Sequence, residues 1–352
     1  MFDPLIGQVY TCSMRFLFFP LLILSTQTFA QTCNESMLLT ASYPLNCDSL
    51  SVAGNIDLSA QTSPIVINVQ NDVVIKAQIK LSGGNGELLS ASGTNIPGGI
   101  GGPGATPGGG IDEFDGPENA PEASGGKAGG FDGFNTSCGD GGSGGGLVNA
   151  GRQGTPCPSS TLTNIGGDAF DLSLIETTLR GGFGGGAGGG PNLLFAAGGG
   201  GGGAIYIIAQ GKITITKTGS IIANGGNGAN STNVNGAGGG GSGGVIILEG
   251  SELDIQGTLS AIGGKGGTAP NNGHGGAGSA GLIRLKNSEG TKDIIGFKAA
   301  NKGVDLNSSI SCGSIKENKK ENAHFLFQIL IPLSLMIVIG NIRKKYPVRL
   351  LK

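Results

Sequence analysis

The sequence predicts an all-β fold, a glycine-rich parallel β-helix or solenoid that is followed by a single C-terminal transmembrane helix. Three observations lead to this prediction. The 352-residue chain contains 72 glycines, no tryptophan and only 13% charged residues, so the surface that can be buried is confined to a few runs rich in Ile, Val and Leu. These runs recur at a fixed spacing, and an apolar segment near the C-terminus is long enough to cross a bilayer.

Four segments share one plan when they are aligned on the glycine tracts that close them. In the last three, the closing tracts begin near Gly225, Gly263 and Asn301, which are 38 residues apart each time. A fixed period of this length is typical of repeat proteins, in which one unit cannot bury its apolar face alone. The four segments are Pro64–Gly86, Gly203–Gly228, Gly243–Gly267 and Ala280–Gly303.

Within a unit, apolar and polar residues alternate as they do in strands. Ile213 and Ile215 flank Thr214, so one face of this short run is apolar. Three short strands with turns between them describe one coil of a parallel β-helix, in which each strand pairs with its counterpart one coil away. In the second unit the expected strands are Ile205–Ile208, Ile213–Ile215 and Ser220–Ala223, and the residues expected to face inward are Ile205, Ile207, Ile213, Ile215 and Ile221.

The alternative fold is a glycine-rich antiparallel β-sandwich. It would use the glycine tracts as hairpin loops, but these tracts are longer than hairpins need. In the solenoid the same tracts are expected to be loops that leave one edge of every coil. Any binding surface is expected on these aligned tracts.

The expected organisation of the chain follows from these units and from the composition of the segments around them. Glycine-rich sequence with few strand-like runs separates the first unit from the others, and a charged polar stretch follows the last one. The expected order is a cap at 31–63 with Cys33 and Cys47, a first β unit at 64–86, a partly irregular glycine-rich insertion at 87–202, three solenoid repeats at 203–310 and a polar stalk at 311–323.

Both ends of the chain carry membrane signals. Residues Met14–Gln31 have one positive charge, an apolar run and small residues near Ala30, which is the layout of a cleavable secretory signal. Residues 1–30 are therefore assigned to a signal-peptide region, with Met14 as an alternative start. At the other end, the apolar stretch Phe325–Ile342 predicts a transmembrane helix at 324–342.

A basic tail, residues 343–352, follows the predicted transmembrane helix. The positive-inside bias places such a tail in the cytoplasm and the region before the helix outside the cell. The sequence therefore predicts a single-pass cell-membrane protein whose N-terminal region is extracellular.

The cysteines are consistent with an oxidising compartment. Two pairs that are close in the sequence, Cys33 with Cys47 and Cys138 with Cys157, are the disulfide candidates, and Cys312 is left over. Zinc is not expected, because the chain has neither a C-x-x-C pair nor two histidines at zinc-finger spacing.

No catalytic constellation stands out. Nucleophilic catalysis needs a base near the nucleophile, and the chain has only two histidines, His274 and His324. The alternative function is an extracellular polysaccharide-degrading β-helix enzyme, either a lyase or a hydrolase, because such enzymes act through carboxylates and some use calcium. Its candidate acids are Asp112, Glu113, Asp115, Glu118, Asp168 and Asp171.

No catalytic, cofactor-binding or metal residue is assigned from the sequence. Residues Gly166–Leu174 partly match the calcium nonapeptide repeat, but Ala169 and Ser173 depart from it and only one copy is present. Nucleic acid is not an expected partner, because acidic residues outnumber basic ones between residues 31 and 323.

The stretch "GGGGSGGVIILEGSELDIQGTLSAIGGKGG", residues 238–267, resembles the repeats of bacterial glycine-rich cell-surface proteins with parallel β-helix-type repeats. The resemblance covers residues 48–303 and implies an exported molecule of the cell envelope. Together with the membrane signals, it predicts a non-enzymatic structural or adhesive protein that presents a glycine-rich solenoid outside the membrane. The expected partner, besides the membrane, is a glycan or another cell-surface ligand.

Overall fold

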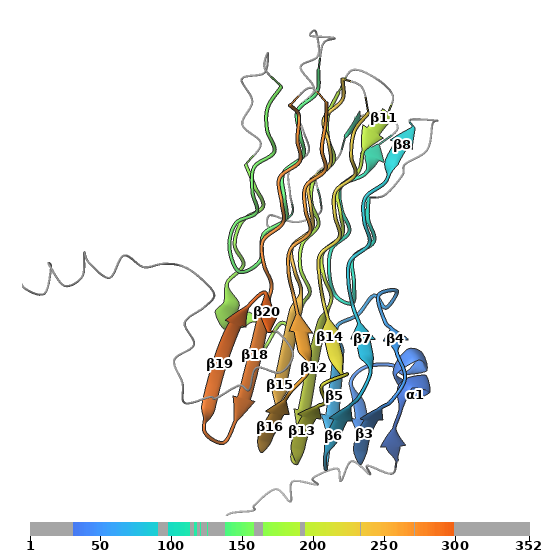
Figure 1. The fold of residues 1–352 in the computed structure, drawn as a ribbon, viewed down its shortest axis with the longest axis vertical. Helices are drawn as coiled ribbons and strands as arrows, with labels where there is room; N and C mark the ends of the chain where they lie inside the picture. Colours follow the sequence, from blue (N-terminus) through green and yellow to red (C-terminus); the bar gives the residue numbers. More distant parts are fainter. Residues whose placement is uncertain are drawn as a thin grey trace, which may run out of the picture.

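The chain folds into two halves of different construction, a lower half of strands and an upper half of long glycine-rich arms (Figure 1). We call them the strand half and the polyglycine half. The computed structural model describes residues 31–90, 98–112, 116–117, 120, 125, 138–157, 165–190, 194–232, 234–270 and 272–298.

The strand half consists of three sheets, and each of the units Pro64–Gly86, Gly203–Gly228 and Gly243–Gly267 contributes one strand to each sheet. The first sheet has the order β19-β18-β15-β12-β5-β2, the second β1-β3-β6-β13-β16 and the third β20-β17-β14-β7-β4. The strands of the first sheet are β2 (Leu45–Cys47), β5 (Ile65–Val69), β12 (Ala204–Ala209), β15 (Val245–Glu249), β18 (Leu282–Asn287) and β19 (Gly290–Ile295). Those of the second are β1 (Thr32–Cys33), β3 (Ser49–Val52), β6 (Val73–Ile75), β13 (Lys212–Ile215) and β16 (Glu252–Ile255). Those of the third are β4 (Ile56–Asp57), β7 (Gln78–Lys80), β14 (Ser220–Ile222), β17 (Thr258–Ser260) and β20 (Phe297–Lys298).

Strands of successive units pair in parallel and in register. Ile205 of β12 lies opposite Ile65 of β5 on one side and Ile246 of β15 on the other, and Ile246 lies opposite Ile283 of β18. Side chains of one type therefore stack in a column, and the alternation of the sequence sends every second one inward. The inward residues predicted from the second unit, Ile205, Ile207, Ile213, Ile215 and Ile221, are all fully buried in one core cluster.

The first sheet is covered on its outer face as well. Phe183 and Ile175, from residues 170–183, pack there against Val245 and Ile247 in a second apolar cluster. We call residues 170–183 the covering segment; it contains the short 3-10 helix η1 (Leu172–Leu174). Burial on both faces explains why β15 reads as a continuous run of apolar residues and not as an alternating one.

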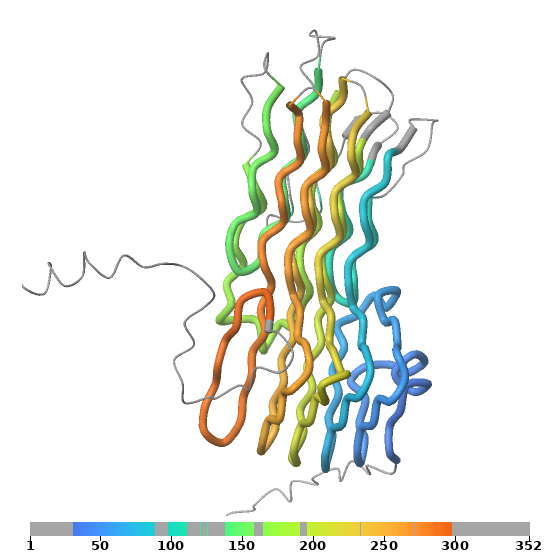
Figure 2. Tube along the Cα trace, viewed as in Figure 1, coloured from blue at the N-terminus to red at the C-terminus, as the bar shows by residue number. Residues whose placement is uncertain are grey.

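The polyglycine half is built from extended arms that run side by side (Figure 2). Three ascending arms, residues 81–88, 223–231 and 261–269, leave the third sheet, and three returning arms, residues 194–203, 235–244 and 273–281, lead back to the first. Further arms from residues 98–109, 138–157 and 180–190 pack beside them. At the far end, β8 (Leu88–Ser90) pairs with β11 (Leu194–Ala196), and β9 (Ile111–Asp112) with β10 (Gly116–Pro117), both antiparallel.

Hydrogen bonds between the arms repeat every three residues, as the three-residue turn of a polyproline-II helix requires. The returning arm 198–203 shows this most completely, because each of its six amides donates to another arm at 2.7 to 3.0 Å. Gly198 and Gly201 donate to the carbonyls of Gly109 and Thr106 on one arm, and Gly199 and Gly202 donate to those of Gly239 and Ser242 on a second. Gly200 and Gly203 donate to those of Gly84 and Leu81 on a third. Its carbonyls accept from residues 99, 102, 182, 185, 226 and 245. This arm is therefore bonded on all sides, and every backbone group is satisfied without a strand or an α-helix.

Glycine is required in this packing because the backbones touch directly. A Cβ atom on Gly200 would lie 2.1 Å from the carbonyl oxygen of Ile100, and one on Gly199 would lie 2.1 Å from that of Gly226. No side chain could move to relieve such contacts, since backbone atoms lie on both sides. The long glycine tracts are therefore the core of this half.

The two ends of the stack of strands are closed differently. At the N-terminal end, helix α1 (Glu35–Thr40) places Leu38 in the core cluster. At the C-terminal end, β19 turns back antiparallel to β18, and β20 pairs antiparallel with β17. These two strands occupy the places that the next unit would fill in the first and third sheets.

The predicted fold class, an all-β glycine-rich parallel β-helix, is wrong for this chain. The described residues include the helix α1, the sheets mix parallel with antiparallel strands, and the glycine tracts are bonded arms and not loops at a coil edge. The alternative, an antiparallel sandwich, is also wrong, because strands of successive units pair in parallel. Both predictions extended the period of the Ile, Val and Leu runs to the whole chain and assigned the long glycine tracts to loops.

The structure also corrects the predicted single-pass membrane location. Within the part of the chain that the structure describes, no helix combines the length and the apolar character that a membrane span needs. The predicted signal region 1–30, the stalk 311–323, the apolar segment 324–342, the basic tail 343–352 and Cys312 all lie outside the described residues.

Candidate interaction face

Side chains leave the three ascending arms at every third position and form one face of the polyglycine half. Because the arms have three residues per turn, positions three apart point in the same direction. The outward residues are Asn85 on the first arm, Asn224, Asn227 and Asn230 on the second, and Ile262, Lys265 and Thr268 on the third; all are exposed except the half-buried Asn224. We call these seven residues the asparagine face.

Each asparagine on this face binds the next arm. The Oδ1 atom of Asn227 accepts from the backbone N–H of Lys265 at 2.8 Å, and its own N–H donates to Oδ1 of Asn85 at 2.9 Å. Asn224 and Asn230 accept in the same way from Ile262 and Thr268, at 3.0 and 2.9 Å. The face is therefore a ladder of side-chain amides.

The ladder of asparagine side chains follows from the geometry of the arms at the surface. One amide in three points away from the neighbouring backbones, and an asparagine oxygen on the preceding arm is placed to accept it. The third arm carries Ile262, Lys265 and Thr268 in place of asparagine, and no described arm follows it in the row.

The asparagine amide groups are left to face outward. Since their oxygens are used by the next arm, the Nδ2 groups of Asn85, Asn227 and Asn230 remain available and have no acceptor among the described residues. Three residues of such an arm rise about 9 Å, so these donors stand at fixed intervals on a stiff surface. A row of spaced N–H donors is suited to a ligand rich in oxygen acceptors.

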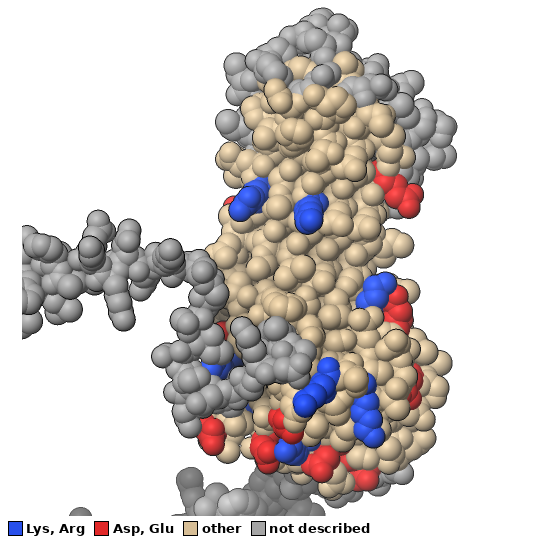
Figure 3. Space-filling model, in the orientation of Figure 1, with Lys and Arg blue, Asp and Glu red and all other residues tan. Residues whose placement is uncertain are grey.

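Charged side chains gather on the strand half, and the visible face of the polyglycine half carries few (Figure 3). One group of charges joins the covering segment to the first sheet. Lys286 Nζ lies 2.9 Å from Glu249 Oε2 and 3.0 Å from Glu176 Oε2, and Arg284 Nη1 lies 3.0 Å from Glu176 Oε1. The hydroxyl of Tyr206 donates to Glu249.

These contacts shift the ionisation of Tyr206 and Glu249 in opposite directions. Burial, with Glu249 adding to it, raises the pKa of Tyr206 to about 12. The hydrogen bond from Tyr206, together with Lys286, lowers the pKa of Glu249 below its ordinary value. The arrangement is a clamp of paired charges and presents no unpaired acid or base to a substrate.

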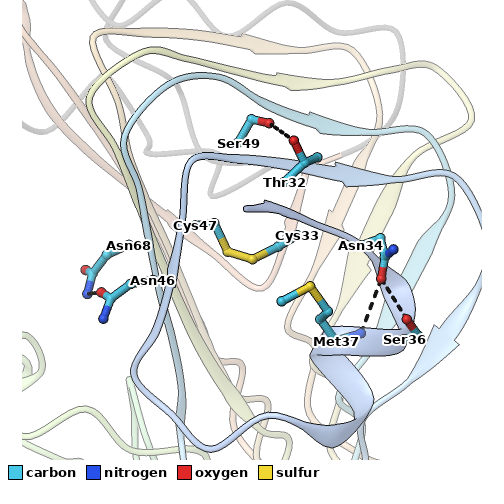
Figure 4. The surroundings of a disulfide bond; sticks show 9 residues. All are labelled: Thr32, Cys33, Asn34, Ser36, Met37, Asn46, Cys47, Ser49 and Asn68. Carbon is cyan, nitrogen blue, oxygen red and sulfur yellow. Dashed lines mark hydrogen bonds between the residues drawn. A yellow bond between two sulfur atoms is a disulfide. The ribbon is translucent and has the colours of Figure 1, made fainter. Parts of the chain in front are cut away.

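The two cysteine pairs named from the sequence both lie at disulfide distance. Cys33 and Cys47 have Cα atoms 5.7 Å apart and join the first short strand to β2 beside helix α1 (Figure 4). Cys138 and Cys157 have Cα atoms 5.8 Å apart and join the two ends of an inserted hairpin of arms. Both separations are within the usual range of disulfides.

The acids considered for catalysis or calcium are not brought together. Asp171 caps helix η1, where its Oδ1 accepts from the amide and the hydroxyl of Ser173. Asp168 lies on a separate stretch before it, and Glu113, Asp115 and Glu118 are outside the described residues, as is the side chain of Asp112. Among the residues that the structure does describe, no three His, Cys, Asp or Glu side chains are placed to hold a metal ion.

His274 is exposed and makes two hydrogen bonds to neighbouring segments. Its Nδ1 atom accepts from the backbone N–H of Ala269 at 3.1 Å, and its own amide donates to the hydroxyl of Thr155 at 2.6 Å. A groove of about 210 Å³ lies between the strand half and the inserted arms, lined by Gln61, Thr62, Ile100 and small residues. None of its lining side chains titrates.

The asparagine ladder was missed at the level of sequence. Its signal is present in "NGGNGANST", where Asn224, Asn227 and Asn230 recur at intervals of three between glycines. That interval matches neither the period of a strand nor that of an α-helix, and it becomes meaningful only with three residues per turn.

No protein-family model, no curated protein and no solved structure matches this chain.

Proposed function

We propose that the protein is a non-enzymatic structural or adhesive protein, which uses the asparagine face to hold a polymer rich in oxygen acceptors, such as a glycan. The observation that supports this most is the ladder itself. Asn85, Asn227 and Asn230 are fixed by bonds to the next arm, and their amide groups point outward at regular intervals.

Rigidity supports an adhesive role. A binding surface whose side chains are already held in place loses little conformational entropy when a ligand binds. The arms beneath the face are bonded to one another at nearly every residue, and the side chains of Asn85, Asn227 and Asn230 are each held by a hydrogen bond from the next arm. Weak contacts repeated along such a surface add to useful avidity against a repetitive polymer.

The cysteine pairs support a compartment in which disulfides persist, such as the outside of a cell. The polysaccharide-degrading alternative receives no comparable support, because its candidate acids Asp168 and Asp171 do not converge on a groove. We therefore propose one function only.

The test is binding of the full-length protein to a panel of immobilised glycans, compared with the double variant Asn227→Asp/Asn230→Asp. Aspartate keeps the oxygen that accepts from the next arm and removes the outward donors. Gln153→Glu makes the same chemical change at an exposed position of another arm and is the matched control.

We expect a saturable signal that the double variant loses and the control keeps. Binding that the double variant leaves unchanged would exclude the asparagine face, and the absence of binding to every glycan would exclude an adhesive role toward glycans. Shortening of a soluble polysaccharide during incubation would contradict the non-enzymatic assignment.

A further inference from the structure

The sequence contains five asparagine–glycine pairs, and all of them lie on or beside the arms of the polyglycine half. At such a pair the asparagine side chain loses its amide readily, because glycine has no side chain to hinder attack by its own backbone nitrogen. The asparagines of the five pairs are Asn85, Asn224, Asn227, Asn235 and Asn272. Which of them reacts depends on the hydrogen bond that the N–H of the following glycine makes in the fold.

The loss of the amide follows a defined course. The backbone nitrogen of the glycine gives up its proton to hydroxide and forms a bond to Cγ of the asparagine, and the bond from Cγ to Nδ2 breaks. The Nδ2 group takes up a proton from water and leaves as ammonia, so a succinimide ring remains. Water then opens the ring at either carbonyl, which gives aspartate or isoaspartate. A glycine N–H that is bound to another arm is kept both from losing its proton and from approaching Cγ.

The three pairs on the asparagine face are bound in this way by the neighbouring arm. The amide of Gly86 donates to a carbonyl of the second ascending arm at 2.8 Å, and the amides of Gly225 and Gly228 donate to carbonyls of the third at 2.9 Å each. The asparagine oxygen of each pair also accepts from the next arm. The nitrogen and the side chain that would react are therefore held by the same neighbour, and they are freed only when two arms separate.

The pair Asn235–Gly236 is protected by burial as well as by a hydrogen bond. The amide of Gly236 donates to the carbonyl of Gly189 at 2.6 Å, and Asn235 is only 1% exposed. The water that must accept the proton and open the ring is thus excluded from this pair.

The pair Asn272–Gly273 differs from the other four. Asn272 is exposed and lies in the bend before the returning arm 273–281, with a left-handed φ of 72°. The bonds of this bend are made by the carbonyl oxygen of Asn272, which accepts from the amide of His274 at 2.6 Å and from the hydroxyl of Thr155. Among the described residues, the amide of Gly273 has no acceptor and the side-chain amide of Asn272 has no partner. A bend at the end of an arm opens without the separation of two arms.

We propose that Asn272 is a site of spontaneous modification, where the side-chain amide is lost through a succinimide with Gly273, and that the bonds between the arms protect the other four asparagines. In the isoaspartate product the main chain runs through the former side chain, and the carbonyl that Thr155 and His274 bind becomes a free carboxylate. The modification therefore weakens the connection between this bend and residues 138–157. It goes beyond the proposed function and needs no ligand.

The test follows the five pairs in the wild-type full-length protein, which is kept either folded or unfolded in urea in warm, mildly alkaline buffer. Samples taken over time are digested at acidic pH, where the succinimide forms slowly. Aspartate and isoaspartate at each pair are then quantified by mass spectrometry. The urea sample shows that the conversion of every pair is detected.

Two variants identify the site independently. Asn272→Gly removes the reacting side chain, and glycine adopts the left-handed φ without strain. Asn149→Gly makes the same change at an exposed asparagine of residues 138–157 and is the matched control. Isoelectric focusing of the folded proteins detects the negative charge that each lost amide adds.

We expect all five pairs to convert at similar rates in urea. In the folded protein Asn272 should convert, and the other four should be slower by about tenfold or more, because their glycine amides are released only when arms separate. The first acidic form should be missing from Asn272→Gly and present in Asn149→Gly. Conversion of Asn85, Asn224 or Asn227 as fast as that of Asn272 would overturn the proposal. An Asn272 that is slowed as much as the others, or an Asn272→Gly variant that acquires the acidic form at the wild-type rate, would overturn it as well.

Discussion

The two halves of the molecule form a buried, hydrogen-bonded core in opposite ways. In the strand half, Ile207 and its neighbours bury apolar side chains in columns, and the backbone bonds follow from parallel pairing. In the polyglycine half, Gly200 and its neighbours bury backbone alone, and the absence of side chains allows each arm to bond to others on every side. The difference teaches that glycine-rich sequence can form a core when every backbone group finds a partner.

The largest expected effect is that of adding one methyl group to the polyglycine core. Gly200→Ala would place a Cβ 2.1 Å from the carbonyl oxygen of Ile100, and two backbones would have to separate. We expect it to lower the free energy of unfolding by about 4 kcal/mol or more, measured by urea denaturation. Gly54→Ala is the control, because its Cβ would meet nothing closer than 3.8 Å. A loss no larger than that of the control would contradict the account of this half.

Removing carbons from the strand core should have a slightly smaller effect. Ile207 is fully buried between Ile67 and Leu248 in the register of β5, β12 and β15. We expect Ile207→Ala to lower the free energy of unfolding by about 2–5 kcal/mol and Ile207→Val by about 1 kcal/mol. Equal losses in the two variants, measured by the same denaturation, would show that this column is not tightly packed.

The asparagine ladder should contribute less than either core. Asn227→Ala leaves the amide of Lys265 without its side-chain acceptor, although solvent can reach it, so we expect a loss of about 1 kcal/mol. Asn227→Asp keeps the accepting oxygen and should be close to wild type in thermal denaturation. If the aspartate variant lost as much as the alanine variant, the accepting oxygen would not be the stabilising feature.

The charge clamp on the strand half should contribute about as much as the ladder, and its contribution should depend on pH. The pKa of Glu249 is lowered in the folded protein, so the hydrogen bond that its carboxylate accepts from Tyr206 stabilises the fold above the ordinary carboxyl pKa of about 4. This stabilisation is lost as the pH falls through the pKa that Glu249 has in the folded protein. Because the pKa of Tyr206 is raised to about 12, its neutral form stabilises the fold fully below the ordinary tyrosine pKa of about 10. This contribution is lost as the pH rises through about 12.

The variant Tyr206→Phe tests the clamp. We expect it to lower the free energy of unfolding by about 1 kcal/mol at neutral pH, and the difference from wild type should shrink in acid. Denaturation series from pH 3 to 8 measure it, and a difference that does not change with pH would show that Glu249 is not the partner that matters.

The strands could be read from the sequence because their side chains carry the period. Ile213 and Ile215 around Thr214 predict β13 correctly, and β12 and β14 were placed within one residue at each end. The arms could not be read in this way, because glycine has no side chain to carry a period. Their structure depends on which backbones lie side by side, and the nearest signal was the interval of three between the asparagines.

The features of the candidate site divide in the same way into those that the sequence predicted and those that it did not. The cysteine pairs were found because short sequence separation favours local pairing, and both lie at disulfide distance. The aligned glycine tracts were named as the place for a binding surface, but as loops, so the asparagine face was not described.

Amide hydrogen exchange of the polyglycine half tests the central claim most directly. The account predicts slow exchange at six consecutive amides, Gly198–Gly203, because each donates to another arm. It also predicts an alternation in the last ascending arm, with Gly264 and Gly267 slow and Gly263 and Gly266 fast. Fast exchange throughout 198–203, as in an unstructured glycine linker, would contradict the bonded core of arms.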